Sequence, residues 1–219
     1  MSNNEVESND PKLLLAASSF PPYVTPSAVL LKNIFDKYNG KIKAFGSTAF
    51  TKIDPAFEPP CEVKYIKFPN GRFAEAISRR FHHHFLFYYY RKLLKFCLDY
   101  KPDLIFSNYP RDVMLVAAYK VSKELKIPLY VYMHDLWHDN VIERAVNVGV
   151  ADFARKWEPL ILKNAKRVFC CTENAQMLYE KKYGIQTDLI YHSIPDEEID
   201  SRMTINNDNS KSKHFIIAY

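Results

Sequence analysis

The sequence has little of what disulfide-rich, secreted or membrane-spanning proteins need. Only five glycines occur among 219 residues, against thirteen prolines, and the four cysteines have no CxxC spacing. Such cysteines favour neither a disulfide framework nor a zinc knuckle, and they indicate a reducing compartment. No apolar run of about 18 residues occurs, so no spanning helix is predicted. The polar, acidic N-terminus MSNNEVESND does not resemble a secretory signal.

Glycine-rich motifs that bind phosphate are missing as well. Neither GxGxxG nor GxxxxGK[ST] occurs, and the loop after the first predicted strand reads SSFPPYVTPSA. Because those motifs use glycine to let the backbone approach a phosphate, their absence disfavours a nicotinamide dehydrogenase and a P-loop nucleotidase. Backbone amides near Ser27 and Ala28 remain a candidate anion site, since they begin a predicted helix.

What is present is the composition and patterning of a globular α/β protein. Hydrophobic residues make up 47% and charged residues 25%. Short apolar runs predict strands at residues 12–18, 41–47, 62–68, 103–107, 128–133, 167–172 and 188–192. Helices are predicted from Pro26 to about 40, at 73–100, at 112–125, from the end of the fifth strand to about 164, and up to 183. This alternation predicts an α/β domain with a Rossmann-like parallel sheet of about seven strands and helices on both faces.

The ends of the chain differ in composition from this domain. Residues 1–11 are predicted to be a disordered arm and residues 12–194 the domain itself. Residues 195–213 are polar and rich in Asn, which is typical of a linker. The last six residues, HFIIAY at 214–219, are strand-like, and we expect them either to pair back into the sheet or to begin a further domain.

Polar side chains follow nearly every predicted strand, at the edge where open parallel sheets bind ligands. Loops are polar in any protein, which explains part of this pattern. His134 and Asp135 are more specific, because they leave an apolar strand and are followed by Leu136 and Trp137. A histidine that changes charge near neutral pH is suited to act as an acid, a base or a partner of a sugar hydroxyl. We therefore expect His134 and Asp135 to be catalytic residues.

No metal or cofactor is predicted. His134 and His138, with Asp135, resemble the HExxH motif of zinc peptidases, but that motif needs both histidines on one helix and His134 directly follows a strand. The three histidines at 82–84 are adjacent, so on a helix they point about 100° apart and cannot share a metal.

Cations are concentrated in one segment of the chain. Residues 64–101 contain nine basic and two acidic residues, so this segment has a net charge of +7, whereas the whole chain has +5. Residues 79–96, RRFHHHFLFYYYRKLLKF, interleave seven aromatics with five basic residues. One interpretation is a core helix with a solvated side; the other is a helix lying on an anionic membrane. The membrane-contact candidates are Arg79, Arg80, Arg91, Lys92 and Lys95. No nucleic-acid partner is expected, because the excess is too local and too aromatic.

The order of these motifs resembles the N-terminal domain of GT-B glycosyltransferases of the family-four type. The resemblance covers about residues 12–219 and is carried by LLLAASSFPPYVTPSAVLLKNIF, YKPDLIFSN, IPLYVYMHDLW, WEPLILKNAKRVFCCTENAQMLYEKKYG and DLIYHSIPDE. It implies two Rossmann-like domains facing across a cleft, with the acceptor mainly on the N-terminal domain and the nucleotide sugar mainly on the C-terminal one. It also implies that His134 lies near the transferred sugar. The substrate-binding candidates that it implies are Pro22, Thr25, Ser27, Asn108, Tyr109, Thr172 and Glu173.

The sequence departs from the family pattern at two places. The first loop usually carries a glycine pair, and here the corresponding residues read Thr25-Pro26-Ser27-Ala28. The donor-binding pair of glutamates separated by seven residues is absent, because none of the twelve glutamates has another eight positions on. Since HFIIAY matches the first strand of the second domain, we expect the chain to end where that domain begins.

These observations favour the acceptor-binding domain of a retaining, nucleotide-sugar-dependent glycosyltransferase of polysaccharide or glycolipid synthesis. The domain alone is expected to be inactive. We also expect it to be cytoplasmic, peripheral on the inner face of the membrane, and able to self-associate through its last strand. The alternative is a non-catalytic module that binds a glycan, a lipid or a protein on a GT-B-like scaffold.

Overall fold

The structure is a computed structural model that describes residues 10–18, 20–47, 54–66, 85–109, 112–143 and 148–191. Several predictions from the sequence fall outside these ranges. They are most of the N-terminal arm, the first part of the helix predicted at 73–100, the histidines at 82–84, Arg79, Arg80, the linker at 195–213 and the strand at 214–219. The domain boundaries and self-association therefore stay predictions.

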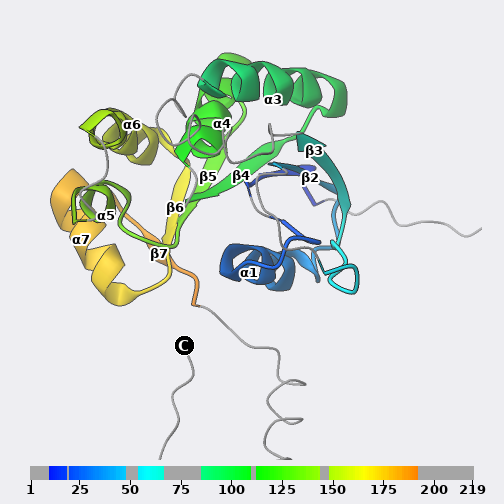
Figure 1. Cartoon of the computed structure of the whole chain (residues 1–219), viewed down its shortest axis with the longest axis horizontal. Coiled ribbons are helices and arrows are strands. Elements are labelled where there is room, and N and C mark those ends of the chain that lie inside the picture. Colours follow the sequence, from blue (N-terminus) through cyan, green and yellow to red (C-terminus); the bar gives the residue numbers. More distant parts are fainter. Residues whose placement is uncertain are drawn as a thin grey trace, which may run out of the picture.

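A single parallel sheet is the centre of the fold, as the sequence predicted (Figure 1). Within the described residues its seven strands are β1 (Leu13–Ala16), β2 (Ile42–Ser47), β3 (Glu62–Ile66), β4 (Leu104–Tyr109), β5 (Leu129–Met133), β6 (Arg167–Cys170) and β7 (Asp188–Leu189). Their spatial order is β3-β2-β1-β4-β5-β6-β7, and every neighbouring pair is parallel. Six of the seven lie within the runs expected to be strands, and β4 starts in its run, 103–107, and continues to Tyr109.

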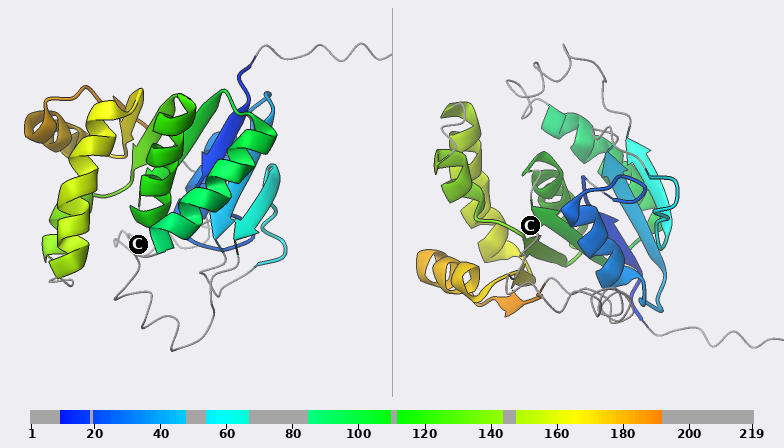
Figure 2. Two further views of the ribbon diagram at one scale, coloured as in Figure 1. Left: turned by 90° about the horizontal axis from the view of Figure 1, so that it is seen from above. Right: turned by 60° about the horizontal axis from the view of Figure 1, so that its bottom comes forward.

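Helices cover both faces of the sheet (Figure 2). Their bounds are α1 (Pro26–Phe35), α3 (Leu86–Tyr100), α4 (Asp112–Leu125), α5 (Trp137–Glu143), α6 (Val148–Asn164) and α7 (Glu173–Tyr183). Side chains of β1 alternate between the two layers: Leu14 and Ala16 belong to the core with α3, α4 and α6, whereas Leu13 and Leu15 belong to the core with α1. This alternation is what the period of a strand requires when both faces are covered.

The prediction of a single helix between β5 and residue 164 is wrong, because the structure has two helices there, α5 and α6. The backbone N–H of His138 donates to Glu158 Oε1 at 3.2 Å, although the two residues are 20 positions apart. On one straight helix they would be separated by about 30 Å. The chain therefore reverses between α5 and α6, and α6 packs back against the start of α5.

Candidate functional site

The order of the strands places the switch point of the sheet between β1 and β4. Chain connections run outward from β1 through β2 to β3, and from β4 in the other direction, so β1 and β4 flank the switch point of the sheet. The loops that follow these two strands diverge, and open α/β sheets bind ligands at this position. Ser107 fastens the two strands together there, because its buried hydroxyl donates to the carbonyl of Ala16 at 2.7 Å.

Two of the predicted site residues, Asn108 and His134, meet directly at this edge. Asn108 ends β4, His134 follows β5, and Asn108 Nδ2 lies 3.2 Å from His134 Nε2. With the amide donating, an uncharged imidazole carries its proton on Nδ1. Asn108 is only 3% exposed, and its buried Oδ1 has no hydrogen-bond partner within the part of the chain that the structure describes. The amide is thus placed to orient the imidazole rather than to contact a substrate itself.

The backbone of His134 is held from the strands on both sides. Its N–H donates to the carbonyl of Tyr109 at 3.4 Å, and its own carbonyl accepts from Cys171 Sγ at 3.0 Å. Burial raises the pKa of the Cys171 thiol, which keeps it protonated and able to donate. The Tyr132 ring meets the imidazole edge-on, with ring centroids 4.5 Å apart. These contacts fix His134 at the middle of the edge formed by β4, β5 and β6.

Asp135 differs from His134 in its surroundings. Asp135 is an exposed residue, and its backbone carbonyl accepts a hydrogen bond from the Tyr179 hydroxyl at 3.1 Å. Asn108 is a partner of His134 Nε2, so Asn108 can orient the imidazole. Catalysis by His134 and Asp135 stays a prediction.

A fully buried carboxylate, Glu158 of α6, supports the loop after His134. Its Oε1 accepts from the backbone N–H of His138 at 3.2 Å and from the Tyr179 hydroxyl at 3.1 Å. Its Oε2 accepts from the Tyr183 hydroxyl and lies 3.7 Å from Lys182 Nζ. We call these four residues, Glu158, Tyr179, Lys182 and Tyr183, the Glu158 cluster.

The Glu158 cluster ties the loop to α7 as well as to α6. The Tyr179 oxygen accepts from the backbone N–H of Trp137 at 3.1 Å while its proton is directed to Glu158 or to the Asp135 carbonyl. Burial, together with Glu158, raises the pKa of both Tyr179 and Tyr183, so both hydroxyls stay protonated. Residues 135–138 therefore have three backbone groups held by buried side chains.

The loop after β1 carries the other predicted contacts, Pro22, Thr25 and Ser27. Thr25 caps α1 by accepting from the Ala28 N–H at 3.1 Å, as the Thr-Pro start signal predicted. The expectation of a free amide at Ala28 is wrong, because the cap already uses that N–H. The Tyr65 hydroxyl donates to the loop carbonyls of Phe20, at 3.2 Å, and Pro21.

Thr172 and Glu173 lie at the start of α7, immediately after Cys171. Thr172 is the cap of that helix and accepts from the Ala175 N–H at 3.2 Å, while Glu173 accepts from the Tyr191 hydroxyl at 3.2 Å. The structure thus brings Thr172 and Glu173 beside the His134 backbone, whereas Pro22, Thr25 and Ser27 lie on the other side of the switch point.

Two supporting residues, Glu158 and Tyr65, were not singled out by the sequence reasoning. Glu158 had one signal, a lone acidic residue between Trp157 and the apolar run of α6, and Tyr65 had none. Among the described residues there is no group of three or more side chains suited to hold a metal. Helices in the same part of the chain are too short or too polar to cross a membrane.

Solved structures share this fold at low identity. Sucrose-phosphate synthase from Thermosynechococcus elongatus matches with a TM-score of 0.59 and 13% identity, over 89% of this chain and 52% of its own. HepE from Anabaena, solved with UDP and glucose, matches with a TM-score of 0.54 and 15% identity, over 90% of this chain and 50% of its own. UDP-GlcNAc 2-epimerase from Neisseria meningitidis, bound to UDP-GlcNAc, matches with a TM-score of 0.55 and 13% identity, over 90% of this chain and 51% of its own.

The chain thus spans about half the length of these three structures, and at such identities the likeness shows the fold, one Rossmann-like domain of the GT-B type. No curated protein sequence matches it. The sequence profile of Glycosyltransferase Family 4, however, matches residues 54–198, which is more than half of the chain and includes β3 to β7. The chain belongs to Glycosyltransferase Family 4.

Proposed function

We propose that this domain is the acceptor-binding part of a retaining glycosyltransferase that uses a nucleotide sugar, in the synthesis of a polysaccharide or glycolipid. The observation that carries the proposal is the Asn108–His134 pair at the carboxyl ends of β4 and β5, beside the switch point of the sheet. Two similar structures hold UDP or a UDP-sugar, which supports a donor of that chemical class. A second domain would hold most of the nucleotide.

In this proposal, His134 touches the transferred sugar and Asn108 orients His134. A retaining transfer builds positive charge on the sugar while the phosphate leaves, so groups aligned with the nucleotide supply most of the stabilisation. An imidazole held through Nε2 contributes by fixing a sugar hydroxyl or by polarising a neighbouring group. The capped start of α1, with Thr25 and Ser27, and the residues Pro22 and Tyr109 would border the acceptor, and Thr172 and Glu173 the side near the donor.

The test compares two substitutions in the protein extended by its second domain, supplied with a panel of nucleotide sugars. His134→Ala is expected to lower kcat by about 10²-fold, the usual effect of losing a positioned acid-base or electrostatic group. Asn108→Asp places a carboxylate beside Nε2, so it is expected to raise the pKa of His134 and shift the pH-rate profile upward. Unchanged turnover in His134→Ala would contradict the proposal.

The unextended chain provides a second measurement. Residues 1–219 alone are expected to transfer no sugar, because the donor-binding glutamate pair is absent from them. Transfer by this chain alone would overturn the division of labour between two domains. Binding of a glycan or lipid without transfer by the extended protein would instead support the alternative, a non-catalytic binding module.

A further inference from the structure

We propose that the outward face of α3 docks on the anionic surface of a lipid bilayer. This goes beyond the proposed function and does not depend on it. The face consists of Phe87, Tyr88, Arg91, Lys92, Lys95 and Leu98, and we call it the α3 face. All six residues are exposed, and Phe87 and Leu98 are 64% and 55% exposed although both are large and apolar.

The phase of α3 separates this face cleanly from the core. At about 100° per residue, its six members fall within an arc of about 120–140°. The opposite side of the helix carries Tyr89, Leu93, Phe96 and Cys97, which are buried. The α3 face runs from Phe87 to Leu98, which is about 16 Å of helix. An amphipathic helix of this kind buries one side in the protein and offers the other to an interface.

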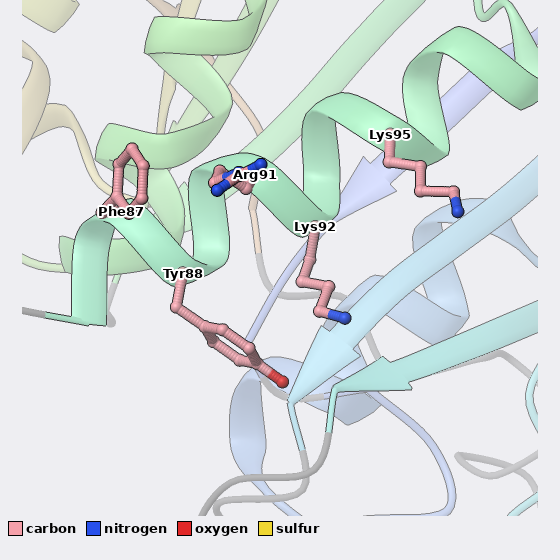
Figure 3. A pocket seen from close by; sticks show the side chains of 5 residues that line it. All are labelled: Phe87, Tyr88, Arg91, Lys92 and Lys95. Atoms are coloured by element: carbon pink, nitrogen blue, oxygen red, sulfur yellow. The ribbon is translucent and has the colours of Figure 1, made fainter.

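Two aromatic rings at the start of the face are followed by three cations, and together they line a hollow. Five side chains, those of Phe87, Tyr88, Arg91, Lys92 and Lys95, line a space of about 470 Å³, and Figure 3 shows them projecting from successive turns of α3. The Arg91 guanidinium lies 5.4 Å from the centre of the Phe87 ring, and Lys92 Nζ lies 5.6 Å from that of Tyr88. Within the described ranges, no carboxylate forms an ion pair with Arg91, Lys92 or Lys95.

A bilayer fits this combination better than a soluble anion does. Three cations that have no carboxylate partner among the described residues complement lipid phosphates, and each contributes to binding near an anionic leaflet. Exposed Phe87 and Leu98 gain nothing from a dissolved phosphate, but they lose contact with water in the headgroup region of a bilayer. Aromatic rings beside the cations match the amphipathic side chains that occur at membrane interfaces. The one acidic residue on this side of the helix is Asp99, at its end.

The test is cosedimentation of the full 219-residue chain with lipid vesicles. We expect binding to vesicles that contain phosphatidylglycerol, release at high salt, and little binding to vesicles of phosphatidylcholine alone. Replacing Arg91, Lys92 and Lys95 by Gln is expected to weaken partitioning by about 100-fold, since each cation contributes about fivefold. Phe87→Ala is expected to weaken binding at low salt, because it removes apolar area that the bilayer would cover.

A matched control removes the same charge elsewhere. Lys163, Lys166 and Lys181 are exposed on or beside α6 and α7, and their replacement by Gln should leave vesicle binding nearly unchanged. Equal loss in both triple variants would show a net-charge effect and overturn the α3 face as the docking site. Absence of binding, equal binding to both kinds of vesicle, or salt-independent binding would overturn the proposal without any variant. None of these outcomes bears on sugar transfer, which is measured separately.

Discussion

The Glu158 cluster and the α3 face use the same kinds of side chain in opposite ways. Each combines charged groups with aromatic rings. Glu158 is fully buried and accepts three hydrogen bonds, whereas the three cations of the α3 face are exposed, and Arg91 and Lys92 lie over rings. A buried charge requires fixed partners and therefore fixes the local backbone. An exposed charge keeps its freedom and is available to a partner outside the chain. The Glu158 cluster thus fixes the loop after His134, whereas the α3 face is a surface open to a binding partner.

The comparison is tested most strongly by Glu158→Ala. This change removes the acceptor of the Tyr183 hydroxyl and of the His138 N–H, and one of the two acceptors of the Tyr179 hydroxyl, at a fully buried position. We expect the free energy of unfolding to fall by about 3–5 kcal/mol, measured by urea denaturation. Asp152→Asn, which breaks the exposed i,i+3 pair with Arg155, should cost less than about 1 kcal/mol. Similar losses in the two variants would mean that the buried carboxylate fixes nothing.

The second prediction separates the two tyrosines of the Glu158 cluster. Tyr179→Phe removes the acceptor of the Trp137 N–H and a donor to Glu158, and it is expected to lower the free energy of unfolding by about 1–3 kcal/mol. Tyr183→Phe removes one donor from a half-buried position, so a smaller loss is expected. Thermal unfolding of both variants measures the difference. A larger loss for Tyr183→Phe would contradict the assignment of Tyr179 as the residue that holds the loop after His134.

Sequence reasoning worked where the determinants are local. Apolar runs indicated every strand, and Thr25 followed by Pro26 indicated the start of α1, because both signals are complete within a few residues. Glu158 was missed because a single glutamate in a helix normally faces solvent, and its burial depends on contacts with α5 and α7 that no local pattern contains. The same reason applies to the reversal between α5 and α6.

The α3 face was only half visible in the sequence. Its cations and aromatics were noted, and the structure describes this helix from Leu86 onward. Since a helix turns about 100° per residue, the side on which Arg91, Lys92 and Lys95 fall is known only when the buried side is known. The buried contacts of Leu93 and Cys97 supply that phase.

The third prediction uses Cys97, on the buried side of α3 and opposite to the α3 face. Burial raises the pKa of its thiol from 9.0 to about 12. The unfolded thiol therefore loses its proton first, so the free energy of unfolding falls as pH rises from about 9 toward 12. Between about pH 8 and pH 10, one such group contributes a loss of about 1 kcal/mol.

Cys97→Ala removes that contribution and makes the decline with pH less steep, although the variant is less stable at every pH. The informative quantity is the slope of the free energy of unfolding against pH, measured in urea under reducing conditions. Cys61→Ala is expected to flatten the slope by nearly the same amount up to about pH 10 and by less above about pH 11, because the pKa of the half-buried Cys61 rises only to about 11. An unchanged slope in Cys97→Ala would mean that the inner side of α3 admits water.

The smallest predicted effect concerns the stability of the α3 face itself. Arg91 and Lys95 are like charges four residues apart, and Lys92 is adjacent, so the three cations repel one another on the folded helix. Replacing all three by Gln is expected to raise the free energy of unfolding by about 0.2–0.5 kcal/mol at low salt, and the gain should disappear as salt screens the repulsion. Urea denaturation at two salt concentrations measures this, with the Lys163, Lys166 and Lys181 variant as the control. A clear loss of stability would show that these cations hold the helix in place, as Glu158 holds its loop. A slight gain would mean that the three cations lower the stability of the folded chain. Their presence would then be explained by binding to an external anionic surface and not by a contribution to the fold.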